Sequence, residues 1–218
     1  QGNFDVRKFT IHEEPWERLR GALDISPGRI RVQKARLDHA QGGADINITA
    51  NLANGPTPIV SSVNGEVSAK NLRVASLLRS AALDQPLTGV VNADVSFNGP
   101  PANLQGAAHI ELVESTAWDW RLDRVVADAT LTDDDIVIKS FHAERQHAKV
   151  DGSGQVDQAT GDFRFAVEGA DWNVRDLETF NDDPHPPSGV LAFDLKGQGR
   201  LPSGADLFDD LSVSGSFG

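Results

Sequence analysis

Residues 86–99 read PLTGVVNADVSFNG, and residues 186–199 read PPSGVLAFDLKGQG. The two segments align without a gap at an offset of 100 residues (189 − 89), and Pro86, Gly89, Val90, Asp94 and Gly99 recur at that offset. Extended backwards, the same offset matches four further positions: Val67, Asn71, Val74 and Leu77 with Val167, Asp171, Val174 and Leu177. The shared frame of 33 residues (99 − 67 + 1) is too long for a turn motif. We therefore predict one structural unit that the chain uses twice.

The residues that follow Gly89 alternate between apolar and polar side chains. Val91, Ala93, Val95 and Phe97 would face one way and the residues between them the other way, which is the pattern of a strand with one buried face. From residue 22 onward the same alternation fills most of the chain, and Gly, Pro, Asn and Asp separate its segments. Many short alternating segments with such turns predict a mainly β protein with an antiparallel sheet.

One helix is predicted with clarity. Between Val74 and Leu83 the apolar residues fall at positions 74, 77, 78, 81 and 82, and residues 84–86 stop the pattern. The counterpart at residues 174–180 is shorter and ends at the loop of residues 183–187. Residues 16–20 could form a helical turn, and Asn64-Gly65 is a hairpin signal. We expect an N-terminal strand and turn segment at residues 1–21, a first repeat unit at 22–99 and a second at 100–218.

Composition narrows the classes of partner. The net charge of −12 and the pI near 4.8 argue against nucleic acid, whose phosphates would be repelled, and against docking to an anionic membrane surface. The chain has no Cys, which excludes disulfides and thiolate chemistry. No apolar run approaches the ~18 residues of a membrane span. The chain starts at Gln1 and stops in mid-pattern, so we expect a processed chain or a piece of a longer one, with any anchor outside it.

Several polar constellations have a plain interpretation. On a strand, His142 and Glu144 would share a face while His147 would point the other way, which makes a three-ligand metal site awkward. The run of residues 133–135 is Asp-Asp-Asp and lacks the Gly and the distal Glu of a calcium loop, so we predict a solvated hairpin turn. Trp118 and Trp120 would lie on one face of a strand, as a core pair or as a lipid contact.

No motif of an enzyme is present in the sequence. Ser153 lies between two glycines but outside the Gly-x-Ser-x-Gly frame of a nucleophile elbow, and the chain has no phosphate-cradling Gly loop. We therefore expect a protein that is not an enzyme and that uses no cofactor and no metal.

The double motif resembles the AsmA/TamB-like family. The resemblance lies in residues 69–78, a loop, Leu87-Thr88-Gly89 and a strand that ends at Gly99, then again in residues 169–177, 187–189 and Gly199. It covers roughly residues 22–218, with Gly197 at the position of Phe97 as one departure. Proteins similar to this are periplasmic chains of Gram-negative envelopes, anchored to the inner membrane. For this chain, that anchor would be a segment outside it.

The resemblance implies a curved antiparallel sheet that forms a U-shaped, taco-like trough with an apolar inner wall. Such troughs are thought to pass phospholipid acyl chains between the inner and outer membranes, and some members are tied to outer-membrane protein assembly. The implied partners are phospholipid acyl chains and membrane proteins of the envelope. The expected lining of the groove is Ile46, Ile48, Val91, Ala93, Val95, Phe97, Ile110, Leu112, Ile136, Ile138, Phe163, Phe165, Leu191, Phe193 and Leu195.

The residues themselves leave two architectures open. One helix cannot cover the apolar face of about a dozen strands, so the sheet either closes into a β-sandwich or barrel or stays open. The pattern alone favours the closed core, and the resemblance favours the open trough. A large exposed apolar surface would mark a binding site, and the small side chains of Ala93, Ala108, Ala127 and Ala129 leave room for one.

Two functions follow from these architectures. The first is a conduit for acyl chains, with head groups left in solvent because no cluster of Lys or Arg is expected on the apolar face. The second is a structural β-rich envelope subunit that binds a partner protein and no ligand.

Overall fold

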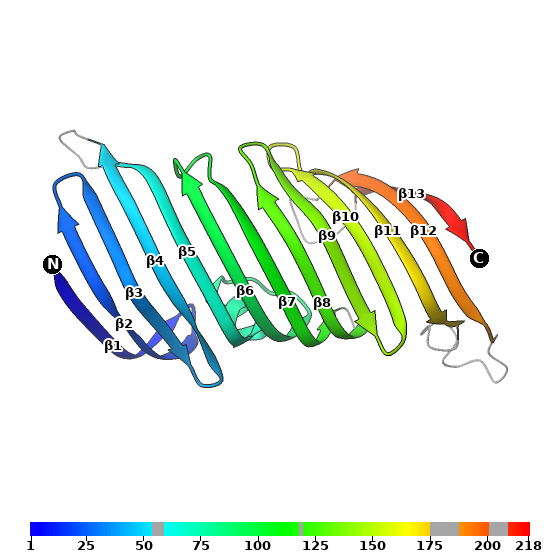
Figure 1. The fold of residues 1–218 in the computed structure, drawn as a ribbon, viewed down its shortest axis with the longest axis horizontal. Helices are drawn as coiled ribbons and strands as arrows, with labels where there is room; N and C mark the ends of the chain where they lie inside the picture. Colours follow the sequence, from blue (N-terminus) through cyan, green and yellow to red (C-terminus); the bar gives the residue numbers. More distant parts are fainter. Residues whose placement is uncertain (54–58, 118–119, 175–187, 201–208) are drawn as a thin grey trace.

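The computed structural model describes residues 1–53, 59–117, 120–174, 188–200 and 209–218. These residues form one antiparallel sheet in which every strand pairs with the strand before it (Figure 1). The prediction of a mainly β protein is therefore confirmed. The elements in chain order are β1 (Gly2–Ile11), β2 (Glu14–Ser26), β3 (Arg29–His39), β4 (Gly42–Ala53), β5 (Ile59–Arg73), α1 (Val74–Ser80), β6 (Leu87–Gly99), β7 (Gln105–Ala117), β8 (Trp120–Leu131), β9 (Asp135–Arg145), β10 (Ala148–Asp157), β11 (Asp162–Asn173), β12 (Val190–Arg200) and β13 (Asp209–Phe217).

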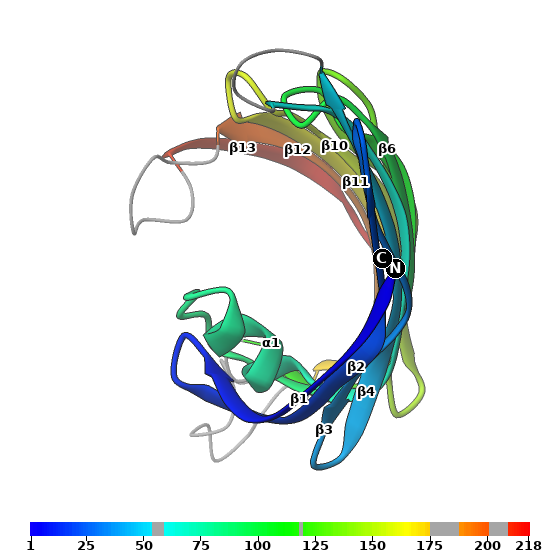
Figure 2. The ribbon, with the colours of Figure 1, turned by 90° about the vertical axis from the view of Figure 1, so that its left-hand side faces the viewer.

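The sheet is a single open layer. Its order runs from β1 to β13 without a crossover, and these two strands lie at opposite ends of the molecule (Figure 1). The expectation of a closed sandwich or barrel is therefore wrong, because the described strands neither meet as two layers nor close a ring. The sheet is not strongly curled, but its strands bow, and α1 lies on their concave side (Figure 2).

The strands of the predicted repeat recur in the same register. Val67 pairs with Val95 in the first copy, and Val167 pairs with Leu195 in the second. The pairing of β5 with β6 shifts between residues 69 and 72, and that of β11 with β12 shifts between 169 and 172. At these shifts Asn71 and Asp171 both have positive φ, of 54° and 61°. Residues 175–180 of the second predicted helix and the loop of residues 183–187 lie outside the described residues.

Helix α1 is confirmed, but it ends at Ser80, three residues earlier than the pattern predicts. Its C-terminus is closed by the Leu83 amide, which donates to the Leu78 carbonyl at 2.9 Å, and by the Ala82 amide, which donates to the Arg79 carbonyl at 3.0 Å. Ala82 stands between these bonds with a φ of 56°. This is a Schellman termination with alanine at the left-handed position that glycine usually occupies. No helix of the described residues is long and apolar enough to cross a membrane.

Two local predictions are wrong. Residues 16–20 belong to β2, where Trp16 pairs with Phe9 and is only 3% exposed, so tertiary burial of the indole decides the local structure. Asn64-Gly65 lies in the middle of β5 and forms no turn. Gly65 pairs with Phe97, whose ring leaves no room for a side chain, since a Cβ on Gly65 would lie 2.7 Å from Phe97 Cζ. A glycine is therefore needed at this position so that the Phe97 ring can pack against the strand.

Candidate binding face

The register aligns apolar residues of neighbouring strands into rows that cross the sheet. One row runs from β1 to β13 without a polar side chain: Val6, Leu19, Leu37, Ala44, Ala69, Ala93, Ile110, Ala127, Phe141, Gly152, Val167, Leu195 and Gly215. Directly paired residues share a face, so all of these lie on one side of the sheet. We call this side, on which α1 packs, the apolar face.

The residues predicted to line a groove all lie on the apolar face. Ala93, Ile110 and Leu195 belong to the row given above. The other candidates form parallel rows: Ile46, Val95, Ile138 and Phe165; Ile48, Phe97, Ile136 and Phe163; and Val91, Leu112 and Phe193, with Leu191 beyond them opposite Trp172. The two-residue alternation therefore assigns the face correctly at each of these positions.

Phenylalanine rings on this face lie over glycines of the adjacent strand. The three heavy atoms nearest to a Cβ added to Gly197 all belong to the ring of Phe165, and those nearest to a Cβ added to Gly169 all belong to the ring of Phe193. Phe163 also lies over Gly199, and Phe4 lies over Gly21. Each ring therefore leans sideways along the sheet and fills the place of an absent side chain. Gly197, which departs from the Phe97 position of the first copy, is explained by this packing.

One end of the apolar face is covered. Helix α1 packs there against a buried cluster that includes Trp16, Leu72 and Val91. Further along the sheet Trp172 is 7% exposed, its ring centroid lies 5.8 Å from that of Trp120, and its Nε1 donates to the Lys149 carbonyl at 3.0 Å. Trp118, the other member of the predicted tryptophan pair, lies outside the described residues. Away from these clusters Ile136, Val213 and Phe217 remain 40%, 49% and 68% exposed.

The opposite side, which we call the polar face, carries ion pairs. His142 lies between Asp151 and Glu144, with Nδ1 2.7 Å from the former carboxylate and Nε2 3.0 Å from the latter. The Glu144 and Asp151 carboxylates raise the pKa of His142. Its ring nitrogens are thus both engaged, and His147 lies beyond the end of β9 in the turn before β10. Among the described residues no group of three or more His, Asp or Glu could hold a metal ion.

The run of three aspartates forms the predicted hairpin turn. Residues 132–134 connect β8 to β9, and the Thr132 amide donates to the Asp135 carbonyl at 2.8 Å. The Asp135 amide in turn donates to the Thr132 hydroxyl at 3.1 Å. Asp133 accepts a hydrogen bond from the Gln105 side chain. These side chains stabilise the turn between the strands.

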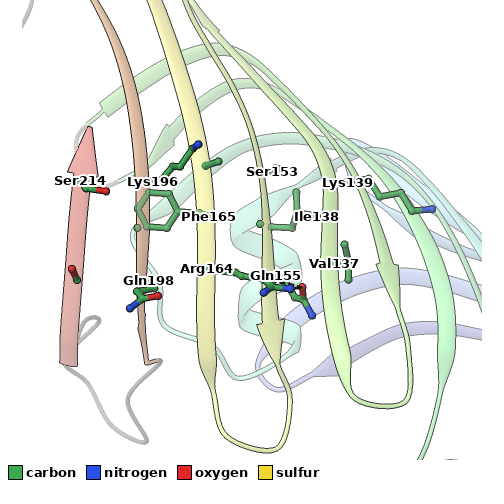
Figure 3. A pocket seen from close by; sticks show the side chains of 14 residues that line it. Val137, Ile138, Lys139, Ser153, Gln155, Arg164, Phe165, Lys196, Gln198 and Ser214 are labelled. Carbon is green, nitrogen blue, oxygen red and sulfur yellow. Dashed lines mark hydrogen bonds between the residues drawn. The ribbon is translucent and has the colours of Figure 1, made fainter. Parts of the chain in front are cut away.

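A shallow hollow of about 710 Å³ crosses strands β9 to β13 on the polar face (Figure 3). Lys139, Arg164 and Lys196 line it together with Ser153, and all four are exposed. No His, Asp or Glu contributes to this lining. Alternation predicts that these residues face solvent, but the hollow depends on how the strands bow, which no residue pattern encodes.

A second cavity, of about 580 Å³, lies where α1 meets the β1–β2 and β3–β4 hairpins. Its wall contains Glu14, whose carboxylate accepts from Arg79 Nε at 2.5 Å and lies 3.0 Å from His39 Nε2. The Arg79 guanidinium lowers the pKa of Glu14 to about 2, against the opposing effect of burial. We call Glu14, His39 and Arg79 the Glu14 cluster. No sequence pattern predicts this cluster, because its members are up to 65 residues apart.

Comparison with protein-family models, with curated proteins and with solved structures finds no match for this chain.

Proposed function

We propose that this chain is a segment of an AsmA/TamB-like envelope protein and that its apolar face carries phospholipid acyl chains. The observation that supports this most is the row from Val6 to Gly215, which offers no polar side chain across the whole sheet. Burial of an acyl chain gains roughly 0.8 kcal/mol per CH₂ and needs only a continuous apolar surface.

The dimensions of the row are compatible with such a path. At about 4.8 Å between strands, thirteen strands span roughly 58 Å. One leaflet of a bilayer is about 15 Å of hydrocarbon, half of the ~30 Å core. The row could therefore hold several chains end to end. In this proposal the bowed sheet is the trough, its concave apolar side holds the tails, and the protein lies in the periplasm, tied to the inner membrane by a segment outside this chain.

The proposed role is binding and transfer without catalysis. Several carboxylates and cations of the polar face form ion pairs, such as Arg124 with Glu111 at 2.8 Å and Arg200 with Asp162 at 2.7 Å. Membrane proteins of the envelope would be partners at the ends of the trough.

A structural subunit without a lipid is the second candidate. The edge strand β13 is exposed along residues 211–218 and carries Leu211 and Val213, which are 43% and 49% exposed. An edge of this kind can pair with a strand of another protein.

The proposal can be tested by introducing a charged side chain on the apolar face, at Val95, in the row beside the one that contains Ala93. Val95→Asp would put an unpaired carboxylate among the tails, whereas Ser96→Asp would put the same group on the polar face. We expect native mass spectrometry of the purified protein to detect bound phospholipid in the wild type and in Ser96→Asp, with a large loss in Val95→Asp. If folded Val95→Asp retains as much lipid as Ser96→Asp, the proposal is wrong and the structural subunit takes its place.

A further inference from the structure

The lining of the cavity beside α1 contains more cations than carboxylates. Its cations are Lys8, Arg73 and Arg79, of which Arg79 forms an ion pair with Glu14. Arg73 Nε donates to the Gln41 side-chain amide, which is uncharged, and Lys8 makes no ion pair within the part of the chain that the structure describes. Glu17 is the other acidic residue of the lining. In a chain with 32 acidic and 20 basic residues, a cavity lined by three cations and two carboxylates has an excess of positive charge, which favours an anionic ligand.

The wall of the same cavity holds a buried hydrogen-bond acceptor without a donor. The Glu14 carboxylate can only accept, so His39 donates its Nε2–H to Glu14, and in the tautomer with this single ring proton Nδ1 keeps a lone pair. His39 Nδ1 is shielded from solvent and has no partner among the described residues, and its side chain is only 10% exposed. A buried polar atom left without a partner is unfavourable, and a hydroxyl donor from a ligand would remove that penalty.

The cavity is continuous with the apolar face. Phe9 and Trp16 line it and also pack in the cluster beneath α1, and Phe9 pairs with Trp16 between β1 and β2. A ligand with its charged end in the cavity therefore meets an apolar surface next to it. The cavity has a volume of about 580 Å³, which is in the range of small-molecule binding sites, roughly 300–1,000 Å³.

We propose that this cavity binds the head group of an anionic phospholipid that carries a free hydroxyl, as a phosphoglycerol does; this rests on the function proposed above. The phosphate lies between Lys8 and Arg73, the hydroxyl donates to His39 Nδ1, and the tails pass over Phe9 and Trp16 onto the apolar face. Charge-assisted hydrogen bonds from the two cations give the phosphate its affinity. This end of the sheet thus binds the head group selectively, whereas the sequence predicts that the head groups remain in solvent.

The test compares soluble short-chain lipids that share their tails, with the dissociation constant measured by calorimetry. Dihexanoyl phosphatidylglycerol should bind the wild type more tightly than dihexanoyl phosphatidylcholine. The double variant Lys8→Gln/Arg73→Gln should bind phosphatidylglycerol about tenfold more weakly and phosphatidylcholine unchanged. The matched control Lys139→Gln/Arg164→Gln removes one Lys and one Arg from the polar face and should keep the wild-type preference.

Further probes separate the parts of the proposal. Phosphatidylethanol has the same charge but no free hydroxyl, and it should bind more weakly than phosphatidylglycerol; equal affinities would contradict the role of His39. Glycerol 3-phosphate alone should bind far more weakly than the lipid. If it binds as tightly, the ligand of the site is a free phosphate ester and the lipid proposal is wrong. If phosphatidylglycerol and phosphatidylcholine bind equally, the head-group site is wrong while the acyl-chain face stands. If neither lipid binds, the function proposed above fails.

Discussion

At the scale of single residues, the Glu14 cluster shows how one buried carboxylate holds a helix to a sheet. The side chain of Glu14 is 4% exposed, and its partner Arg79 comes from the last turn of α1. Trp16 Nε1 adds a hydrogen bond to the Ser80 hydroxyl at 3.1 Å. Because the pKa of Glu14 is depressed in the folded state, its ionised form contributes stability above the unfolded pKa, near 4.5, and this contribution is lost as the pH falls toward 2.

We expect Glu14→Gln to lower the free energy of unfolding at pH 7 by about 1–3 kcal/mol, since it removes a charge-assisted bond to Arg79. The same substitution should flatten the fall in stability between pH 4.5 and pH 2. Urea denaturation across this pH range measures both effects. The control Glu17→Gln alters an exposed carboxylate nearby and should change stability by less than about 0.5 kcal/mol. An unchanged pH profile in Glu14→Gln would contradict the account of this carboxylate.

The packing of phenylalanine over glycine makes a second prediction at this scale. Gly197→Ala would place a methyl group in the ring of Phe165 and should cost about 1–3 kcal/mol. In a Phe165→Ala background the same change should cost much less, because the three heavy atoms nearest to that Cβ all belong to the ring. Unfolding free energies of the two single variants and the double variant decide this, and equal costs in the two backgrounds would refute the packing.

At the scale of elements, α1 is a seven-residue helix whose C-terminus depends on a strained alanine. Ala82→Gly should raise the free energy of unfolding by about 0.5–1 kcal/mol, because glycine adopts the φ of 56° without steric conflict. The matched control Ala75→Gly lies in the first turn of α1, where φ is not positive, and should lower the free energy of unfolding by up to about 1 kcal/mol. Thermal denaturation compares the two variants, and a loss of stability in Ala82→Gly would contradict the described termination.

The sequence predicts elements well where one local rule acts alone. Alternation placed the strands and their faces, and the offset of 100 residues located two strand pairs with the same register shift. It failed where distant residues decide. Trp16 is a strand residue because α1, some sixty residues later, covers it. Gly65 lies under the Phe97 ring, where a side chain would clash. The Glu14 cluster forms only when the fold brings β2, β3 and α1 together.

At the scale of the whole molecule, the sheet is one layer with unlike faces. The polar face carries ion pairs and hydrogen bonds between its side chains. The apolar face is covered at one end by α1, and elsewhere its Ile136 and Val213 side chains are exposed. A soluble protein rarely leaves a long apolar surface uncovered without a ligand or a partner. The two-residue alternation predicts this asymmetry, but it cannot predict the open, single-layer form, because the strands of a closed sandwich alternate in the same way.

The central claim is that acyl chains lie on the apolar face, and site-specific photo-crosslinking in cells that produce the protein tests it most directly. Val95 and Phe193 carry the probe on the apolar face, and their neighbours Asp94 and Asp194 carry it on the polar face. We expect phospholipid adducts, identified by mass spectrometry, at Val95 and Phe193 and none at the two aspartate positions. Well-folded protein that captures only protein at Val95 and Phe193, or that captures lipid equally at all four positions, would contradict the account.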